Sequence, residues 1–204
     1  HGIAGYKNTY PTYHVPRIGG QNAEYLVISL KGFRTGERTH KNMNLQAEAL
    51  SDQDMEDIAI YLNGQTGQPG TSSAGNAARG QSKSAVCHAC HGPTGDAVQP
   101  IYPHLGGPHQ DYLEKTRRAV RDGSRPNAIM AGFATNLSDT DIEDLAAWYA
   151  SQSGLTELQE QYSCPCQWGR SCASCARGIP FILNISTSGR DSASVKRPRD
   201  CRAV

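Results

Sequence analysis

Two stretches of the chain share a spacing of apolar residues that is typical of amphipathic helices. Apolar side chains three and four positions apart lie on one face of a helix. These positions are Met55, Ile58, Ala59 and Leu62 in one stretch, and Ile142, Leu145, Ala146 and Tyr149 in the other. Each stretch opens with a serine, Ser51 or Ser138, followed three residues later by an aspartate. That pairing predicts a capping box at the start of each helix.

Further helices are expected over residues 23–35, 110–122 and 77–86, the last leading into a pair of cysteines. No segment shows the strong alternation of apolar and polar residues that marks a half-buried strand. The predicted fold class is therefore all-α.

The two helical patterns belong to an internal repeat. An offset of 87 positions aligns two segments without gaps: Gly19-Gly20 with Gly106-Gly107, Tyr25-Leu26 with Tyr112-Leu113, Arg38 with Arg125, Met43 with Met130, and Leu50-Ser51-Asp52 with Leu137-Ser138-Asp139. After a three-residue gap, His1-Gly2 also aligns with His91-Gly92. The period is too long for a solenoid unit, so the repeat indicates a duplicated domain.

The domain boundaries follow from this alignment. The first domain spans residues 1–65 and the second spans 76–153; we call them the first and the second repeat. A stretch rich in Gly, Ser and Pro, residues 66–75, reads as a flexible linker between them. Residues 154–204 match neither copy.

Composition excludes some classes of protein. A net charge of +1 does not suggest a nucleic-acid binder. No run of 18 apolar residues is available to span a membrane. Hydrophobic residues make up 37% of the chain, which is low for a self-sufficient core, and a large cofactor would supply the missing apolar mass. The seven cysteines, none before Cys87, do not look like a uniform disulfide framework.

One motif carries chemistry. Residues 87–91 read Cys-His-Ala-Cys-His, the attachment signature of c-type haem. Two thiols three positions apart on a helical turn reach the two vinyl groups of one haem edge, and the next residue, His91, projects its imidazole toward the iron. A thioredoxin-type redox pair would need a βαβ pattern, which is absent. A zinc site would need a second ligand pair within the second repeat.

A second axial ligand is expected from a methionine. Met130 stands in a loop-like stretch, residues 126–132, between two predicted helices, and Met43 occupies the matching place in the first repeat. A lone methionine more often fills a core, but these two repeat and Met55 does not. We therefore predict that Met130, and with it Met43, binds iron. The histidines His14, His40, His104 and His109 do not repeat and are expected at the surface.

Both copies resemble class I cytochromes c, and the tandem pair resembles the dihaem cytochromes of the c-four type. The resemblance covers residues 1 to about 153 and rests on the motif at 87–92, the segment 102–107, the Met130 loop and the helix after Leu137. It implies two haem c groups with His/Met ligation, His91 with Met130 and His1 with Met43. It also implies that the carbonyls of Pro16 and Pro103 accept a hydrogen bond from the axial histidines, which fixes the tautomer of each ring.

Arg38 and Arg125 each stand five residues before a methionine. An arginine fork matches a carboxylate, so these side chains are candidates to contact haem propionates. A solvated loop position is an equally open interpretation.

The sequence departs from the family pattern at two places. His1 aligns with His91, so the cysteines of the first motif would precede residue 1 and only one haem is covalently attachable as the sequence stands. An N-terminal histidine can also chelate copper in proteins with a β-sandwich core, but this chain reads as helical. The second departure is the tail, where Cys164, Cys166, Cys172 and Cys175 have no following histidine. We interpret the tail as a disordered extension, with zinc binding, disulfides or an altered reading frame as the alternatives. We expect residues 156–204 to be dispensable for haem binding and for the fold of the second repeat.

The resemblance implies a periplasmic electron carrier, not an enzyme, that shuttles electrons between respiratory donors and a terminal oxidase or reductase. The expected partners are redox proteins, namely an oxidase, a reductase or a dehydrogenase, with no nucleic acid and no transmembrane segment; peripheral contact with a membrane stays open. The alternative is a haem-bearing subunit of a dehydrogenase complex. A peroxidase would need an open iron position, which Met43 and Met130 argue against.

Overall fold

The computed structural model describes residues 1–3, 5–9, 11–65 and 74–158. Most of the predicted linker and the four cysteines of the tail from Cys164 to Cys175 lie outside these residues, as does Cys201. Helices dominate the described part, which confirms the predicted fold class. The elements are β1 (Lys7–Asn8), β2 (Tyr13–His14), α1 (Ala23–Thr35), α2 (Lys41–Glu48), α3 (Asp52–Asn63), α4 (Ala77–Lys83), the 3₁₀ helix η1 (Ser84–Cys87), α5 (His88–His91), α6 (Gln110–Arg121), α7 (Ala128–Ala134) and α8 (Asp139–Ala150).

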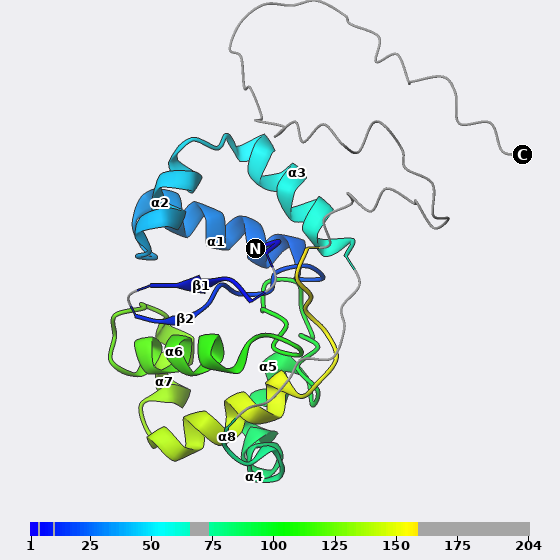
Figure 1. Cartoon of the computed structure of the whole chain (residues 1–204), viewed down its shortest axis with the longest axis vertical. Helices are drawn as coiled ribbons and strands as arrows, with labels where there is room; N and C mark the ends of the chain where they lie inside the picture. Colours follow the sequence, from blue (N-terminus) through cyan, green and yellow to red (C-terminus); the bar gives the residue numbers. More distant parts are fainter. Residues whose placement is uncertain (4, 10, 66–73, 159–204) are drawn as a thin grey trace, which may run out of the picture. The chain divides into compact units, whose positions relative to one another are not determined.

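The helices α1, α2 and α3 of the first repeat recur in the same order as α6, α7 and α8 of the second (Figure 1). Both predicted capping boxes are present, with Ser51 accepting from the Asp54 backbone and Ser138 from that of Asp141, each at 3.1 Å. A shared helix end also repeats: Gly36 and Gly123 adopt left-handed backbone angles just beyond α1 and α6.

Each repeat has its own small core, and the two cores are built from equivalent residues. Leu26, Ala59 and Leu62 cluster between α1 and α3. Leu113, Ala146 and Tyr149 cluster between α6 and α8, and each lies 87 positions after its counterpart. The duplication seen in the sequence is therefore a duplication of packing as well.

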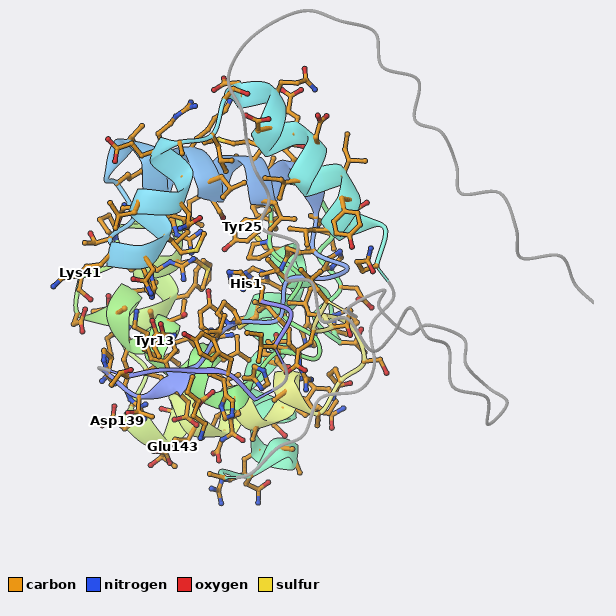
Figure 2. All side chains as sticks on the ribbon, turned by 45° about the horizontal axis from the view of Figure 1, so that its top comes forward. His1, Tyr13, Tyr25, Lys41, Asp139 and Glu143 are labelled. Carbon is orange, nitrogen blue, oxygen red and sulfur yellow. The ribbon has the colours of Figure 1, made fainter. Side chains whose placement is uncertain are left out.

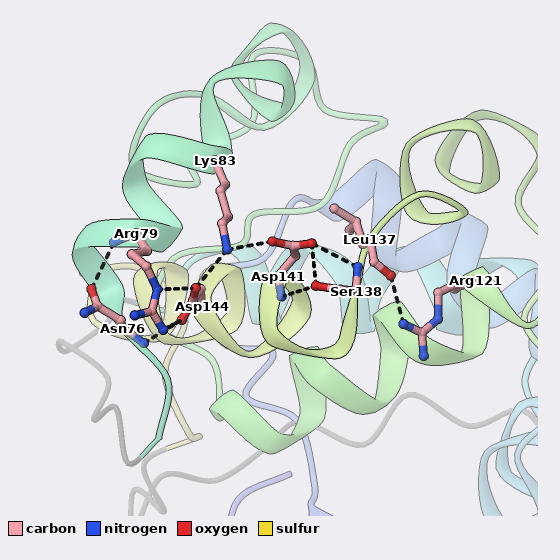
Figure 3. Close-up of polar contacts among 8 residues, drawn as sticks. All are labelled: Asn76, Arg79, Lys83, Arg121, Leu137, Ser138, Asp141 and Asp144. Atoms are coloured by element: carbon pink, nitrogen blue, oxygen red, sulfur yellow. Dashed lines mark hydrogen bonds and ion pairs between the residues drawn. The ribbon is translucent and has the colours of Figure 1, made fainter.

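In the second repeat, the helix α4 before the cysteine motif crosses α8 closely. A Cβ atom added at Gly80 would collide with the carbonyl oxygen of Asp144 and lie 2.8 Å from the Cβ of Trp148. The Asp144 side chain is fully buried, and Arg79 Nε and Lys83 Nζ donate to it at 2.8 and 2.9 Å (Figure 3). A buried carboxylate is tolerated when it is paired in this way.

One hairpin was not predicted. The strands β1 and β2 pair antiparallel, with Lys7 opposite His14 and Asn8 opposite Tyr13, and lie between α1 and α6 (Figure 1). Strands of two residues are too short to show an alternating pattern, which is why the sequence gives no sign of them.

The segment just beyond α8 was expected to belong to the unmatched tail. In the structure it packs against the first repeat instead. Leu155 and Thr156 are buried, Thr156 pairs with Gly19 in an antiparallel bridge, and Leu158 packs on the Leu26 cluster. The packed part of the chain thus extends beyond Gly154 to at least Leu158.

Candidate haem sites

The motif of the second repeat is held by short helices that end sharply. Cys87 ends η1, Cys90 lies in α5, and both are half-buried free thiols. Gly92 ends α5 with a φ of 68°, and a Cβ there would collide with the carbonyl oxygen of Asp96. The chain can therefore turn away directly after His91, which leaves both thiols and the imidazole on one short turn.

The His91 ring is oriented by a backbone carbonyl. His91 is 5% exposed, and its Nδ1 lies 2.9 Å from the carbonyl oxygen of Pro103. Because a carbonyl only accepts, Nδ1 carries the proton and Nε2 keeps its lone pair. Burial lowers the pKa of His91, and the charge of Arg117 lowers it further, against the opposing effect of the Pro103 contact. A neutral imidazole with a free Nε2 is the form that binds a metal.

The first repeat contains the same arrangement. The Nδ1 of His1 lies 2.8 Å from the carbonyl oxygen of Pro16. His1, Pro16, Arg38 and Met43 all line one cavity of about 920 Å³, and Arg125 of the second repeat reaches the same cavity. The structure thus gathers all four first-repeat residues predicted for a haem site.

The two methionines occupy equivalent places, but these are not loops. Met43 and Met130 are third residues of α2 and α7, and both are half-buried. The backbone N–H of Met130 donates to the Asn127 side chain at 2.9 Å, and that of Met43 to the His40 side chain at 3.3 Å. The loop expected around Met130 is wrong because each capping side chain starts a short helix at this point.

Charge in the first-repeat cavity points to an anionic ligand. Among the described residues its lining includes Arg17, Arg38, Lys115 and Arg125 but neither Asp nor Glu. Of these four cations, Arg17 has partners of its own, because it donates to the carbonyl oxygen of Gly107 and faces Glu157. Apolar walls, a histidine, a methionine and unbalanced cations together fit a haem with its two propionates.

The second repeat has a matching feature that the sequence did not reveal. Arg117 is 7% exposed and stacks near the Tyr149 ring, yet it forms no ion pair with a carboxylate of the described chain. Its Nε is buried without a hydrogen-bond partner in that part, as is the indole Nε1 of Trp148. A buried guanidinium of this kind needs an anion. Arg117 aligns with Leu30, so the repeat gave no signal for it.

The non-repeating histidines are not simply at the surface as expected. His14 Nδ1 lies 2.7 Å from Asp111 Oδ2, and the His14 ring stacks on His109 at 4.5 Å. His109 in turn faces Glu157 at 3.1 Å. His104 contacts Gln21 through its backbone, at 2.7 and 3.1 Å. These residues hold the two repeats and the segment after α8 together.

No group of three or more His, Cys, Asp or Glu side chains in the described ranges is arranged to hold a metal ion. In the same ranges, no helix has the length and apolar character needed to cross a membrane.

Comparison with known proteins places these sites in context. Residues 75–148 match the family described as cytochrome c oxidase, cbb3-type, subunit III. The chain is 49% identical to cytochrome c4 of Pseudomonas aeruginosa over 79 residues, which cover 39% of each protein. It is 35% identical to cytochrome c4 of Thiocapsa roseopersicina over 62% of this chain and 73% of that protein.

Two further similarities cover much of the described chain. The thiosulfate dehydrogenase electron acceptor of Stutzerimonas stutzeri is 33% identical over 67% of this chain and 70% of its own length. The crystal structure of reduced cytochrome c4 from Pseudomonas stutzeri matches with a TM-score of 0.62 at 31% identity, over 67% of this chain and 84% of that one.

Proposed function

This chain belongs to the cytochrome c4 family of dihaem electron-transfer cytochromes, and from that premise we propose that it shuttles electrons between respiratory redox proteins in a bacterial periplasm. The observation that carries the proposal is a repeated one. Both His91 and His1 donate from Nδ1 to a proline carbonyl, Pro103 or Pro16, and so present the opposite nitrogen of the ring. Two sites with the same histidine orientation suit a chain that accepts and passes on electrons at two haem centres.

In the second repeat, Cys87 and Cys90 tether the haem through thioether bonds. His91 through Nε2 and Met130 from α7 would be the protein ligands that hold the iron. Haem c supplies an iron that alternates between the ferric and ferrous states. The hydrogen bond from His91 to Pro103 holds the ring in one orientation and raises its basicity as a ligand. Buried Arg117 would supply positive charge for a haem propionate in the second repeat.

In the first repeat, His1 and Met43 take the same roles, and Pro16 orients His1. We assign Arg38 to propionate contact because it lines the cavity and no carboxylate of the described chain is paired to it. Its guanidinium carbon lies 4.3 Å from the centre of the Phe33 ring. Each site offers a histidine and a methionine that would complete the coordination of a haem iron, which would leave no position for a substrate. The residues therefore favour electron transfer over turnover.

A second candidate is a haem-bearing subunit of a dehydrogenase complex. One specific observation favours it: the Stutzerimonas stutzeri relative is called a thiosulfate dehydrogenase electron acceptor. In either case the partners are redox proteins. The two candidates differ in whether a dehydrogenase stays bound, so isolation from the native periplasm separates them: a carrier elutes alone, and a subunit elutes with a dehydrogenase in fixed proportion.

Haem attachment is the direct test of the proposed site. Acid-acetone extraction of the full chain should leave one haem bound, and Cys87→Ala with Cys90→Ala should release it. The oxidised protein should show a weak sulfur-to-iron band at the red end of its spectrum. Complete extraction from the unmodified chain would show that the motif does not attach haem.

A further inference from the structure

The cavity of the first repeat is built by both repeats. Three of its cations have no carboxylate partner in the described chain: Arg38 comes from the first repeat, and Lys115 and Arg125 come from the second. Arg38 and Arg125 are equivalent residues of the duplication, as are Tyr25 and Tyr112, which also line this cavity. The cavity is therefore lined by both members of each equivalent pair, one from each repeat.

Arg125 crosses between the repeats. Its Nη2 donates to the Tyr25 hydroxyl at 3.1 Å. Burial would lower the pKa of Arg125, but the adjacent phenols of Tyr25 and Tyr112 outweigh burial and raise it, so the guanidinium stays charged. Figure 2 shows Tyr25 and His1 in the same region, between the ribbons of the two repeats. The half-buried guanidinium of Arg125 contacts two tyrosine side chains and forms no ion pair with a carboxylate of the described chain, so it can bind an anion in the cavity.

We propose that Arg125, with Lys115, completes the propionate-binding wall of the first-repeat haem site, and that Tyr25 is the positioning residue that aims Arg125 into it. The inference rests on the proposed function of the cavity and names a residue of the other repeat as part of it. One haem is then bound by both repeats, and its reduction potential depends on a second-repeat charge.

Two kinds of evidence support this assignment. Arg125 and Lys115 line a cavity whose lining holds no carboxylate, although Asp122 outside that lining attracts Lys115, and in a haem only the two propionates are anionic. The shape agrees, since the cavity that contains His1 and Met43 continues to these cations without a side chain of opposite sign. An arginine fork binds a carboxylate through two parallel hydrogen bonds, which a lysine cannot reproduce.

The experiment uses two haem probes on the full chain. Haemin is titrated into the first-repeat cavity of a chain that is made to begin at His1, while the second repeat keeps its attached haem. Haemin is compared with its dimethyl ester, in which both propionates are uncharged. The unmodified chain should bind haemin at least about tenfold more tightly than the ester, as expected for charge-assisted hydrogen bonds.

Arg125→Gln should remove most of that preference, and Lys115→Gln part of it. The matched control is Lys41→Gln, which removes an exposed cation of α2 that does not line the cavity (Figure 2). Tyr25→Phe should weaken the preference without removing a charge. A redox titration supplies the second readout: Arg125→Gln should lower the potential of the first-repeat haem, with about a tenfold change in its reduction equilibrium corresponding to 59 mV.

The outcomes separate the two proposals. If haemin binds in a manner abolished by His1→Ala, but Arg125→Gln and Lys115→Gln leave the preference over the ester unchanged, Arg125 is not part of the site and this inference is overturned. If haemin binding does not depend on His1 or Met43, the proposed haem site itself is wrong. Loss of preference in Lys41→Gln to the same degree as in Arg125→Gln would also overturn the inference, since it would show a general effect of charge.

Discussion

Arg79 on α4 and Asp144 on α8 form a two-pronged ion pair, with the guanidinium Nε and Nη2 donating to the two carboxylate oxygens at 2.8 and 3.0 Å. The Asp144 side chain is fully enclosed, and Lys83 adds a third charged donor from the same helix. This pair joins the helix that leads into the haem motif to the helix that closes the second repeat (Figure 3). The haem motif is therefore anchored through a titratable group.

Acid should loosen this anchor. Hydrogen bonds from Arg79 and Lys83 hold the pKa of Asp144 well below its ordinary value of 3.8, and hydrogen bonds from Lys83 and Ser138 lower the pKa of Asp141 to about 2. A folded pKa below the unfolded one stabilises the protein above the unfolded pKa, and that stability is lost as pH falls through the folded pKa. The melting temperature of the second repeat should therefore drop between about pH 4 and pH 2.

The control for this acid effect is Asp144→Asn. The variant should melt at a lower temperature at neutral pH because Arg79 and Lys83 lose their carboxylate. Its melting temperature should also change less with pH in the acid range, which circular dichroism melts would record. An acid transition of the same size in the variant would assign the effect to other carboxylates.

The crossing of α4 over α8 should not accept a side chain at Gly80. Gly80→Ala forces a methyl group against the Asp144 carbonyl, and we expect a loss of about 1–3 kcal/mol in the free energy of unfolding. The matched control is Gly132→Ala on α7, where nothing lies within 4 Å. That change should stabilise the helix by roughly 0.5–1 kcal/mol. Denaturant titration measures both, and equal effects would contradict the close crossing.

Substitutions at two methionines, Met130 and Met55, should distinguish a role in binding iron from a role in core packing. Met130→Ala should abolish the second repeat's sulfur-to-iron band and lower its potential, since thioether ligation favours ferrous iron. Met55 is fully buried in the first repeat, so Met55→Ala should cost about 2–5 kcal/mol of unfolding free energy and leave that band in place. Optical spectra of the two variants test which one loses the sulfur-to-iron band, and denaturant titrations test which one loses stability. A spectrum unchanged by Met130→Ala would remove it as a ligand.

The segment after α8 should matter over only a few residues. Leu155 is 4% exposed, so Leu155→Ala is expected to cost about 2–4 kcal/mol. A chain ending after Leu158 should match the full chain in melting temperature and haem content, whereas one ending after Ser153 should melt lower. If both shortened chains behave like the full one, the contacts of Leu155 and Thr156 contribute nothing to stability.

The helices were predictable because their signals are local. Residues 23–35 were expected to be helical and form α1, and the serine and aspartate at the start of α3 and α8 formed the capping boxes as expected. The short helix around Met130 was missed because Pro126 precedes it and Gly132 lies within it, and its start depends on one side chain, that of Asn127. Local rules weigh such residues against helix formation before a cap is known.

The contacts between repeats were not predictable in the same way. A period of 87 residues relates equivalent positions, but it carries no information on how one copy faces the other. Two contacts depend on the relative orientation of the repeats: the hydrogen bond between Arg125 and Tyr25, and the stacking of His14 on His109. Arg117, which has no counterpart in the first repeat, shows the complementary limit: a site residue present in one copy alone leaves no trace in an internal alignment.

The pairing of Thr156 with Gly19 has a mechanical consequence. The second repeat is joined to the first through the chain that leads into it, and it returns to the first repeat at its own end through this bridge. A module tethered at one end can swivel, whereas a module fastened at both ends is braced. Electron tunnelling falls off steeply with separation, so bracing of this kind would make the rate between the two centres a property of the fold and not of a swinging tether.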